Sequence, residues 1–295
     1  MTIYPKIGVI FHGLLPEAKQ LVSALGRRYT NGHTWWSATQ DTLNERADDL
    51  AETDLIVTIG GDGTILRGAH EAAPRGIPIL GINMGRVGFM SEIDAEDALD
   101  GLGWYLEGNA RLDERYMLRA EIFSGGERVE PDLFALNDVT VARGAVLRVI
   151  EVGTVVDGVH LADYRGDGLV VSTATGSTGY TLSLGGPVMD PESEDYLVKP
   201  IATHMSQFGG VILQSTSTLE LTVHSSSPAT ISADGFIDCP LVDGQTVRVS
   251  HASIKATFLR KRPRAAFWAD LSRRLGMRVS ALPREPRKYG DSSTM

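Results

Sequence analysis

The sequence is poor in cysteine, since Cys239 is the only one in 295 residues. A single thiol excludes an internal disulfide and a cysteine cage around a metal ion, and it is typical of a reducing compartment. Long apolar runs are also lacking: no stretch approaches the roughly 18 apolar residues that a membrane-spanning helix needs. The first residues lack the basic flank and apolar run of a signal peptide. We therefore expect a soluble, cytoplasmic protein with no membrane partner.

Positive charge is in deficit as well. Lys and Arg number 28 against 37 Asp and Glu, which gives a net charge of −9. This balance argues against a surface that coats nucleic acid, so we expect no nucleic-acid partner. If the ligands are anionic nucleotides, their attraction must be local, from backbone N–H groups, a metal ion and a few arginines.

The first part of the chain, residues 1–112, alternates strand and helix signals. Apolar runs at residues 7–11, 55–59 and 77–82 are typical of buried strands. Apolar residues at helical spacing follow each run: Ala18, Leu21, Val22 and Leu25, then a helix at about residues 64–73, then Ala98, Leu102 and Leu106. Strands separated by helices predict an α/β domain with a parallel sheet.

After about residue 112 short β-rich runs replace the helices. Val152, Thr154 and Val156 alternate up to Asp157-Gly158, a preferred hairpin dipeptide. The pattern predicts an all-β, sandwich-like second domain over residues 113–258. A last helix is expected at Ala265–Leu275, within a segment 259–285 that returns to the first domain. The polar tail, residues 286–295, is expected to be disordered.

A glycine-rich turn, Gly60-Gly61-Asp62-Gly63-Thr64, lies between a predicted strand and a predicted helix. Glycines let the backbone come close to a ligand, and the helix start offers unpaired N–H groups, so the turn is typical of a phosphate site. No Gly-Lys-Ser/Thr follows, so this is not a P-loop. A carboxylate beside phosphates is repulsive unless it binds Mg²⁺ or takes a proton from an attacking hydroxyl. The alternative is that Asp62 caps the helix, because Asp is a favoured N-cap residue.

The same turn resembles the signature of a kinase superfamily that includes NAD kinases, diacylglycerol and sphingosine kinases and, more distantly, phosphofructokinases. A second block, from Gly166 to Pro187, resembles the long motif of the NAD kinase family almost throughout. Asn83–Phe89 and Ala135–Val139 also resemble that family. Weaker similarities follow at Pro200–His204 and Ala233–Gly235.

The resemblance implies transfer of the γ-phosphoryl group of ATP, or of polyphosphate, to the adenosine-ribose 2′-hydroxyl of NAD, giving NADP. It implies that Asp62 is the general base, that Mg²⁺ or another divalent cation lies on the donor phosphates, and that the protein is a homodimer or homotetramer. Alternatives remain open: a lipid or sugar kinase with the same turn, and a catalytically silent NAD(P)-binding regulator.

The residues of the second block suit a dinucleotide site. Thr175, Ser177, Thr178 and Ser183 place hydroxyls on glycine-rich backbone, and Tyr180 can lie against a flat base. Asn137 and Asp138 can bond to an adenosine or ribose edge. In the family's pattern Asn137, Asp138, Asp167 and the Thr178–Ser183 stretch contact NAD. The arginines at 67, 148 and 165 often face the nucleotides in that family, and His204 matches a family histidine for which a structural role is as well supported. The expected nucleotide-binding residues are Gly61, Asp62, Gly63, Arg67, Asn137, Asp138, Arg148, Arg165, Asp167, Thr175, Thr178, Gly179, Tyr180, Thr181, Leu182 and Ser183.

Three single positions and one short stretch depart from the family's pattern. Asp138 stands where the family mostly has glutamate, and Gly179 replaces the usual alanine. Residues 205–210 differ from the usual Leu-Ser and Arg-Pro continuation, and Phe236 replaces a common glutamine. These differences concern the substrate pocket and subunit contacts rather than the reaction.

Overall fold

The computed structural model describes residues 2–85, 88–145, 148–203 and 209–277. The chain forms two compact units that meet between Arg260 and Lys261. The first unit contains both predicted domains. The second contains helix α6 (Ala266–Arg274), which agrees with the helix expected at Ala265–Leu275. Its return to the first domain stays a prediction, and the tail 286–295 and His204 lie outside the described residues.

A parallel sheet forms the first part of unit one. It contains β1 (Lys6–Phe11), β2 (Thr34–Thr39), β3 (Leu55–Gly60), β4 (Ile79–Asn83) and β5 (Ile93–Asp94), all paired in parallel. The accompanying helices are α1 (Pro16–Arg28), α2 (Ala47–Ala51), α3 (Asp62–Ala72) and α4 (Ala98–Leu106), with 3₁₀ turns at Leu43–Arg46 and Ala73–Arg75. Every residue of β3 and β4 is buried, as expected for parallel strands covered on both faces. The α/β prediction is confirmed.

The order of these strands creates a crevice. The sheet runs β2-β1-β3-β4-β5, so the chain moves from β1 to one side for β2 and to the other side for β3. At such a switch point the loops after two neighbouring strands diverge, and ligands bind outside the carboxyl ends of the strands. The predicted glycine turn follows β3 at this edge.

The second part of unit one is a β-sandwich. One layer is an antiparallel sheet in the order β14-β13-β12-β9-β16-β17, and the other contains β11, β10, β15, β18 and β6, with β7 and β8 beside β6. A core cluster that draws on both layers includes Val171 and Val249. The predicted all-β domain is confirmed. The bounds are β6 (Arg111–Ser124), β7 (Glu127–Arg128), β8 (Leu133–Ala135), β9 (Asp138–Arg143), β10 (Ile150–Val156), β11 (Val159–Gly166), β12 (Gly168–Thr173), β13 (Tyr196–Ile201), β14 (Val211–Leu213), β15 (Leu219–His224), β16 (Ala229–Ala233), β17 (Ile237–Leu241) and β18 (Thr246–Arg260).

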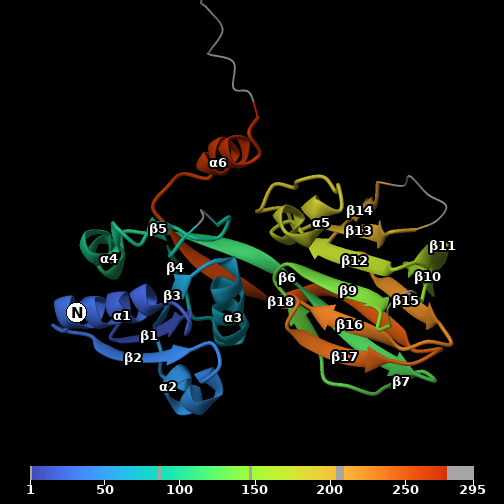
Figure 1. Ribbon diagram of the computed structural model, residues 1–295, viewed down its shortest axis with the longest axis horizontal. Coiled ribbons are helices and arrows are strands. Elements are labelled where there is room, and N and C mark those ends of the chain that lie inside the picture. Colours follow the sequence, from blue (N-terminus) through green and yellow to red (C-terminus); the bar gives the residue numbers. More distant parts are fainter. Residues whose placement is uncertain (1, 86–87, 146–147, 204–208, 278–295) are drawn as a thin grey trace, which may run out of the picture. The chain divides into compact units, whose positions relative to one another are not determined.

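Two long strands belong to both parts. β6 and β18 pair antiparallel from Thr246↔Phe123 to Arg260↔Arg111, with an irregularity between His251 and Lys255. The far end of β18 then pairs in parallel with β4, which joins one layer of the sandwich to the parallel sheet (Figure 1). The domain limits expected at 112/113 and 258/259 fall inside these strands and remain predictions. No helix in the described part of the chain is long and apolar enough to cross a membrane.

Candidate active site

The glycine turn joins β3 to α3. Gly61 is the N-cap residue of α3, and no side chain in the described chain caps the helix there. Gly60 must be a glycine, because a Cβ at this position would lie 2.2 Å from the Thr64 hydroxyl oxygen. Because the N-cap residue is Gly61 and no described side chain caps the helix, the alternative that Asp62 serves as the helix cap is wrong.

The Asp62 carboxylate instead reaches a separate segment. Its Oδ2 accepts a hydrogen bond from the Phe89 N–H at 2.9 Å, and its Oδ1 accepts one from the Met90 N–H at 3.3 Å. Gly88 allows this approach, because a Cβ there would lie 2.1 Å from Asp62 Oδ1. Asp62 is partly exposed, so its carboxylate is fixed in place and still reachable.

A cavity of about 560 Å³ lies at the carboxyl edge of the parallel sheet. His12 after β1, Gln40 after β2, Gly61 and Gly63 after β3 and Met84 after β4 all line it, which is the position that the strand order indicates. Buried Asn83, at 4% exposure, also lines the cavity. Its Nδ2 donates to Gly85 O and Asp94 Oδ1, while its Oδ1 has no hydrogen-bond partner in the described structure.

The opposite wall of the cavity comes from the sandwich, at the turn Asp234–Phe236 between β16 and β17. The Arg67 guanidinium lies over the Phe236 ring at 4.7 Å, and the His70 ring packs edge-on against the same ring. His70 Nε2 also lies 2.7 Å from Asp234 Oδ2. Helix α3 therefore holds the sandwich with Arg67 and His70, one turn apart. Arg67 was expected at the site, whereas His70 was not.

Asp234 connects this wall to the predicted NAD-binding residues. Its side chain is fully buried, and its carboxylate accepts the backbone N–H groups of Leu136, Asn137 and Asp138 at 2.7–3.0 Å. Its backbone has a positive φ of 53°. The sequence marked Ala233-Asp234-Gly235 only as a weak similarity. An Asp-Gly pair after an alternating strand signals a turn, but it does not indicate a buried carboxylate.

Asn137 and Asp138 lie where β9 begins. Burial, and then repulsion from the Asp234 carboxylate, raise the pKa of Asp138 to about 6. Asn137 Oδ1 is buried without a partner in the described residues. Gly176 packs on the Asn137 backbone so closely that a Cβ would lie 2.0 Å from its carbonyl oxygen. This contact brings the Asn137-Asp138 pair beside the 175–183 segment.

The hydroxyls of the 175–183 segment divide into two groups. Thr178 and Ser183 donate to backbone carbonyls three residues earlier, at Thr175 and Tyr180. Thr175 and Thr181 are buried, and their hydroxyl oxygens have no partner within the described chain. Tyr180, which begins the short helix α5 (Tyr180–Ser183), is 45% exposed and presents its ring. Gly179 is exposed and Leu182 half-buried.

The remaining predicted residues lie apart from the cavity. Asp167 pairs with Arg143, with 2.6 Å between Arg143 Nε and Asp167 Oδ1, a partner that the sequence did not reveal. Arg148 and Arg165 are exposed, and neither lines the cavity as far as the described residues show. Arg86 and Val87 of the Asn83–Phe89 block lie outside the described residues. The described residues contain no group of three or more His, Cys, Asp or Glu side chains that could hold a metal ion.

A strand–glycine turn–helix unit that holds a fixed carboxylate and lines a cavity between the α/β part and the β-sandwich defines a phosphotransferase. The family comparison makes this specific: residues 15–110 match the ATP-NAD kinase N-terminal domain and residues 136–261 match the ATP-NAD kinase C-terminal domain. The chain is 41% identical over 274 residues to the NAD kinase of Dehalococcoides mccartyi (strain CBDB1), covering 92% of this chain and 96% of that protein. The chain belongs to the NAD kinase family.

Solved structures agree with this result. The chain is similar to an NAD kinase from Archaeoglobus fulgidus in complex with ATP, with a TM-score of 0.73, 28% identity and coverage of 91% of this chain and 98% of that one. The fold also matches yeast NADH kinase complexed with NADH, with a TM-score of 0.80 and 21% identity over 95% of this chain and 90% of that one.

Proposed function

We propose that this protein transfers the γ-phosphoryl group of ATP to the 2′-hydroxyl of the adenosine ribose of NAD, with Asp62 as general base. The observation that carries the proposal is the orientation of Asp62. Its carboxylate leaves its own helix uncapped and is held by two amides of residues 89 and 90. Two accepted bonds leave about half of the carboxylate's lone-pair positions for a substrate hydroxyl.

The cavity at the sheet edge is the proposed donor site. The start of α3 offers backbone N–H groups at Gly61 and Gly63 for phosphates, and Arg67 adds a positive charge. The cavity extends to His12 and Gln40, and its volume of about 560 Å³ lies within the usual range for small-molecule sites. The nucleoside part of ATP could occupy this extension beyond the phosphates, whereas polyphosphate has no such part. The extension therefore favours ATP as the donor.

The segment beside β9 is the proposed NAD site. Unpartnered buried oxygens on Asn137, Thr175 and Thr181 can bond to ribose hydroxyls or amides, and the exposed Tyr180 ring can stack on a base. Asp167, together with Arg143, supplies a further polar edge. Arg148 and Arg165 remain proposed contacts on the strength of the family resemblance alone.

A divalent cation, expected to be Mg²⁺, fits the oxygen atoms near the turn. Mg²⁺ prefers one or two protein carboxylates or amide oxygens together with substrate phosphates over an all-protein cage. The unpartnered Asn83 Oδ1 beside the turn is a ligand of this kind, which leaves the Asp62 carboxylate free to act as the base. When bound, the cation would neutralise charge on the donor phosphates. The homodimer or homotetramer implied by the resemblance also remains proposed.

A direct assay tests the proposal. Purified protein, NAD, ATP and Mg²⁺ should produce NADP, detected with a coupled NADP-specific dehydrogenase. EDTA should abolish turnover, and Mg²⁺ or Mn²⁺ should restore it. NAD binding without any NADP formation would indicate a silent regulator and overturn the proposal. Full activity in metal-free buffer would overturn the role of the cation.

A further inference from the structure

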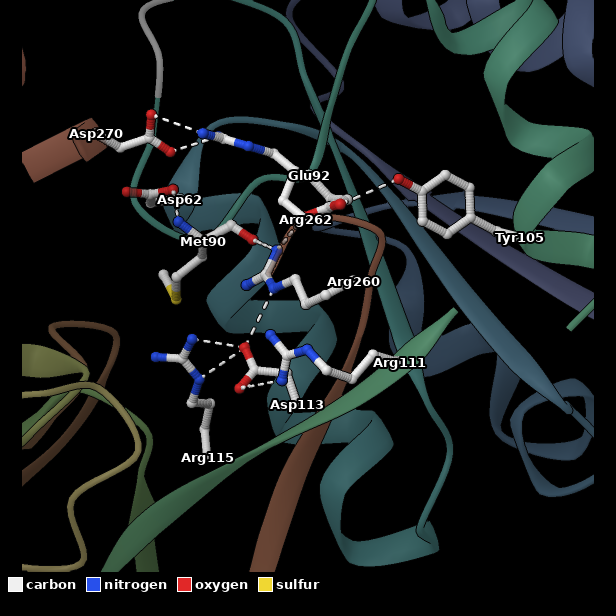
Figure 2. Close-up of polar contacts among 10 residues, drawn as sticks. All are labelled: Asp62, Met90, Glu92, Tyr105, Arg111, Asp113, Arg115, Arg260, Arg262 and Asp270. Carbon is white, nitrogen blue, oxygen red and sulfur yellow. Dashed lines mark hydrogen bonds and ion pairs between the residues drawn. The ribbon is translucent and has the colours of Figure 1, made fainter. Parts of the chain in front are cut away.

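The Met90 peptide group makes polar contacts on both of its sides. Its N–H donates to Asp62 Oδ1 at 3.3 Å, and its carbonyl oxygen accepts a hydrogen bond from the Arg260 guanidinium at 2.8 Å. Figure 2 shows Met90 between the two side chains. Among the described residues Arg260 makes no hydrogen bond to the glycine turn, so the Met90 peptide group is the hydrogen-bonded link between Arg260 and Asp62.

Arg260 is itself held rigidly. Its side chain is 9% exposed, and the guanidinium lies 3.2 Å from Asp113 Oδ2 and 3.4 Å from Glu92 Oε2. Glu92 accepts a further hydrogen bond from the Tyr105 hydroxyl, and Arg115 donates to Asp113 Oδ2, the same oxygen that Arg260 contacts (Figure 2). A cation between two nearly buried carboxylates has few alternative positions.

Asp113 and Arg260 of this cluster both remain charged at neutral pH. Burial alone would raise the pKa of Asp113, but the guanidiniums of Arg115 and Arg260 outweigh it and hold the pKa below its usual range. Asp113 is therefore an anion at neutral pH, and Arg260 is a cation because guanidinium groups do not lose their proton in proteins. The hydrogen bond to Met90 is charge-assisted, and so stronger than one between neutral groups.

The cluster also links Asp62 to the body of the fold. Arg260 is the last residue of β18 and Asp113 lies in β6, the two strands shared by the parallel sheet and the sandwich. Residues 88–92 come from the connection between β4 and β5. A short segment that carries the two amides for Asp62 is thus fastened to the strands shared by both domains.

We propose that Arg260 is a positioning residue for phosphoryl transfer, which fixes the Met90 peptide and through it the Asp62 carboxylate. The inference rests on the proposed function, in which Asp62 is the base. Reacting groups must be held close to the productive geometry, and a misplacement of about 1 Å can cost roughly 10²-fold in rate. Loss of Arg260 should therefore lower kcat and leave substrate binding largely intact.

The first experiment replaces Arg260 by Met. We expect kcat to fall roughly 10- to 100-fold, while the KM for NAD and the KM for ATP stay close to wild type. Arg260→Lys keeps the charge and one donor to the carbonyl, so its kcat should lie between those of wild type and Arg260→Met. Arg115→Met is the matched control: Arg115 is similarly buried, at 12% exposure, and binds the same carboxylate, but within the described structure it makes no hydrogen bond to Met90. It should lose stability yet keep most of its kcat.

The second experiment combines Arg260→Met with Asp62→Asn. If Arg260 acts through Asp62, the Met substitution should have little further effect on kcat once the base is absent. Equal losses in both backgrounds, or a wild-type kcat in Arg260→Met, would overturn the inference. If Arg260→Met does not fold, Arg260→Gln is measured in its place, and a wild-type kcat in that uncharged variant would overturn the inference. An Asp62→Asn protein with nearly full activity would instead overturn the proposed base.

Discussion

Two Asp-Gly sequences in this fold make the same kind of contact, but one serves structure and the other serves the proposed reaction. In both Gly61-Asp62-Gly63 and Ala233-Asp234-Gly235, the aspartate accepts backbone N–H groups from a distant segment. The Asp234 side chain is fully buried, and its carboxylate accepts three N–H groups and a hydrogen bond from His70. Asp62 is partly exposed and accepts two N–H groups. A carboxylate with all its acceptor positions filled supports structure, whereas one with positions to spare can do chemistry.

The comparison is tested most strongly by Asp62→Asn. The substitution keeps the shape of the side chain but removes its charge and basicity. Turnover should fall roughly 10²- to 10⁴-fold, which is about 3–5 kcal/mol of barrier. The unfolding free energy should change by only about 1 kcal/mol, because one amide contact is lost at a partly exposed site. Steady-state kinetics and urea denaturation measure the two effects. Activity within about tenfold of wild type would contradict the role of Asp62 as general base.

Asp234→Asn should show the reverse balance. Asn tolerates the positive φ at this position, so the change isolates the loss of the carboxylate. Breaking a fully buried charged contact usually costs about 3–5 kcal/mol of stability. The variant should therefore denature at clearly lower urea concentration.

Asp157→Asn is the control for that change. Asp157 also has positive φ, precedes a glycine and accepts one N–H, from Thr218, but it is exposed. It should lose less than about 1 kcal/mol. Similar losses in the two variants would mean that the Asp234 contacts contribute nothing beyond an ordinary turn.

The pH dependence of stability should reveal Asp138. Its pKa is about 6 in the folded protein, above the ordinary value of 3.8, so the folded state binds the proton more tightly than the unfolded state. The unfolding free energy must then fall as pH rises from about 4 to about 6. At about 1.36 kcal/mol per pKa unit, the contribution is roughly 2–3 kcal/mol. The unfolding free energy can be measured by urea denaturation at several pH values for wild type and for Asp138→Asn. Between about pH 4 and pH 6 it should fall more steeply with pH in wild type than in the variant. The same pH dependence in both proteins would contradict the raised pKa of Asp138.

Among the substitutions of predicted site residues, the smallest effect is expected for Tyr180→Ala. Removing a base-stacking ring should weaken NAD binding by about 1–2 kcal/mol, or roughly tenfold. The ring is largely exposed, so stability should hardly change. Calorimetric titration with NAD measures the difference, and Tyr180→Phe should bind nearly as well as wild type. Unchanged affinity in the Ala variant would remove Tyr180 from the NAD site.

The sequence predicted those elements whose signals lie within a few neighbouring residues. The buried runs of β1, β3 and β4 and the glycine turn were all evident, because their signals lie within a few residues. Strand β2 was missed, since Thr34–Thr39 has too few aliphatic residues to stand out. The continuous sheet was also missed, because a domain limit was expected at 258/259, which lies inside β18.

The missed residues of the site share one property. His70 contacts Asp234, 164 positions away, and Arg260 contacts Met90, 170 positions away. Arg143 was missed in the same way, as the partner of Asp167. In the sequence, a charged residue with no motif around it is typical of a solvated surface position. Only the fold reveals which distant residue its side chain contacts. The resemblance to the family located Asp62 but not what holds it.

The shared strands β6 and β18 determine how this molecule can move. The two halves are not joined by a loose linker, because β6 and β18 both run from one half into the other and pair with each other over twelve residue pairs. Swinging one half against the other would have to bend both strands together, and the irregularity between His251 and Lys255 is the place where the ladder resists such bending least. Because both strands are shared, a fragment cut at residue 112 or 258 would carry an unpaired strand edge, which is prone to aggregation. The two halves are therefore expected to fold only as one piece.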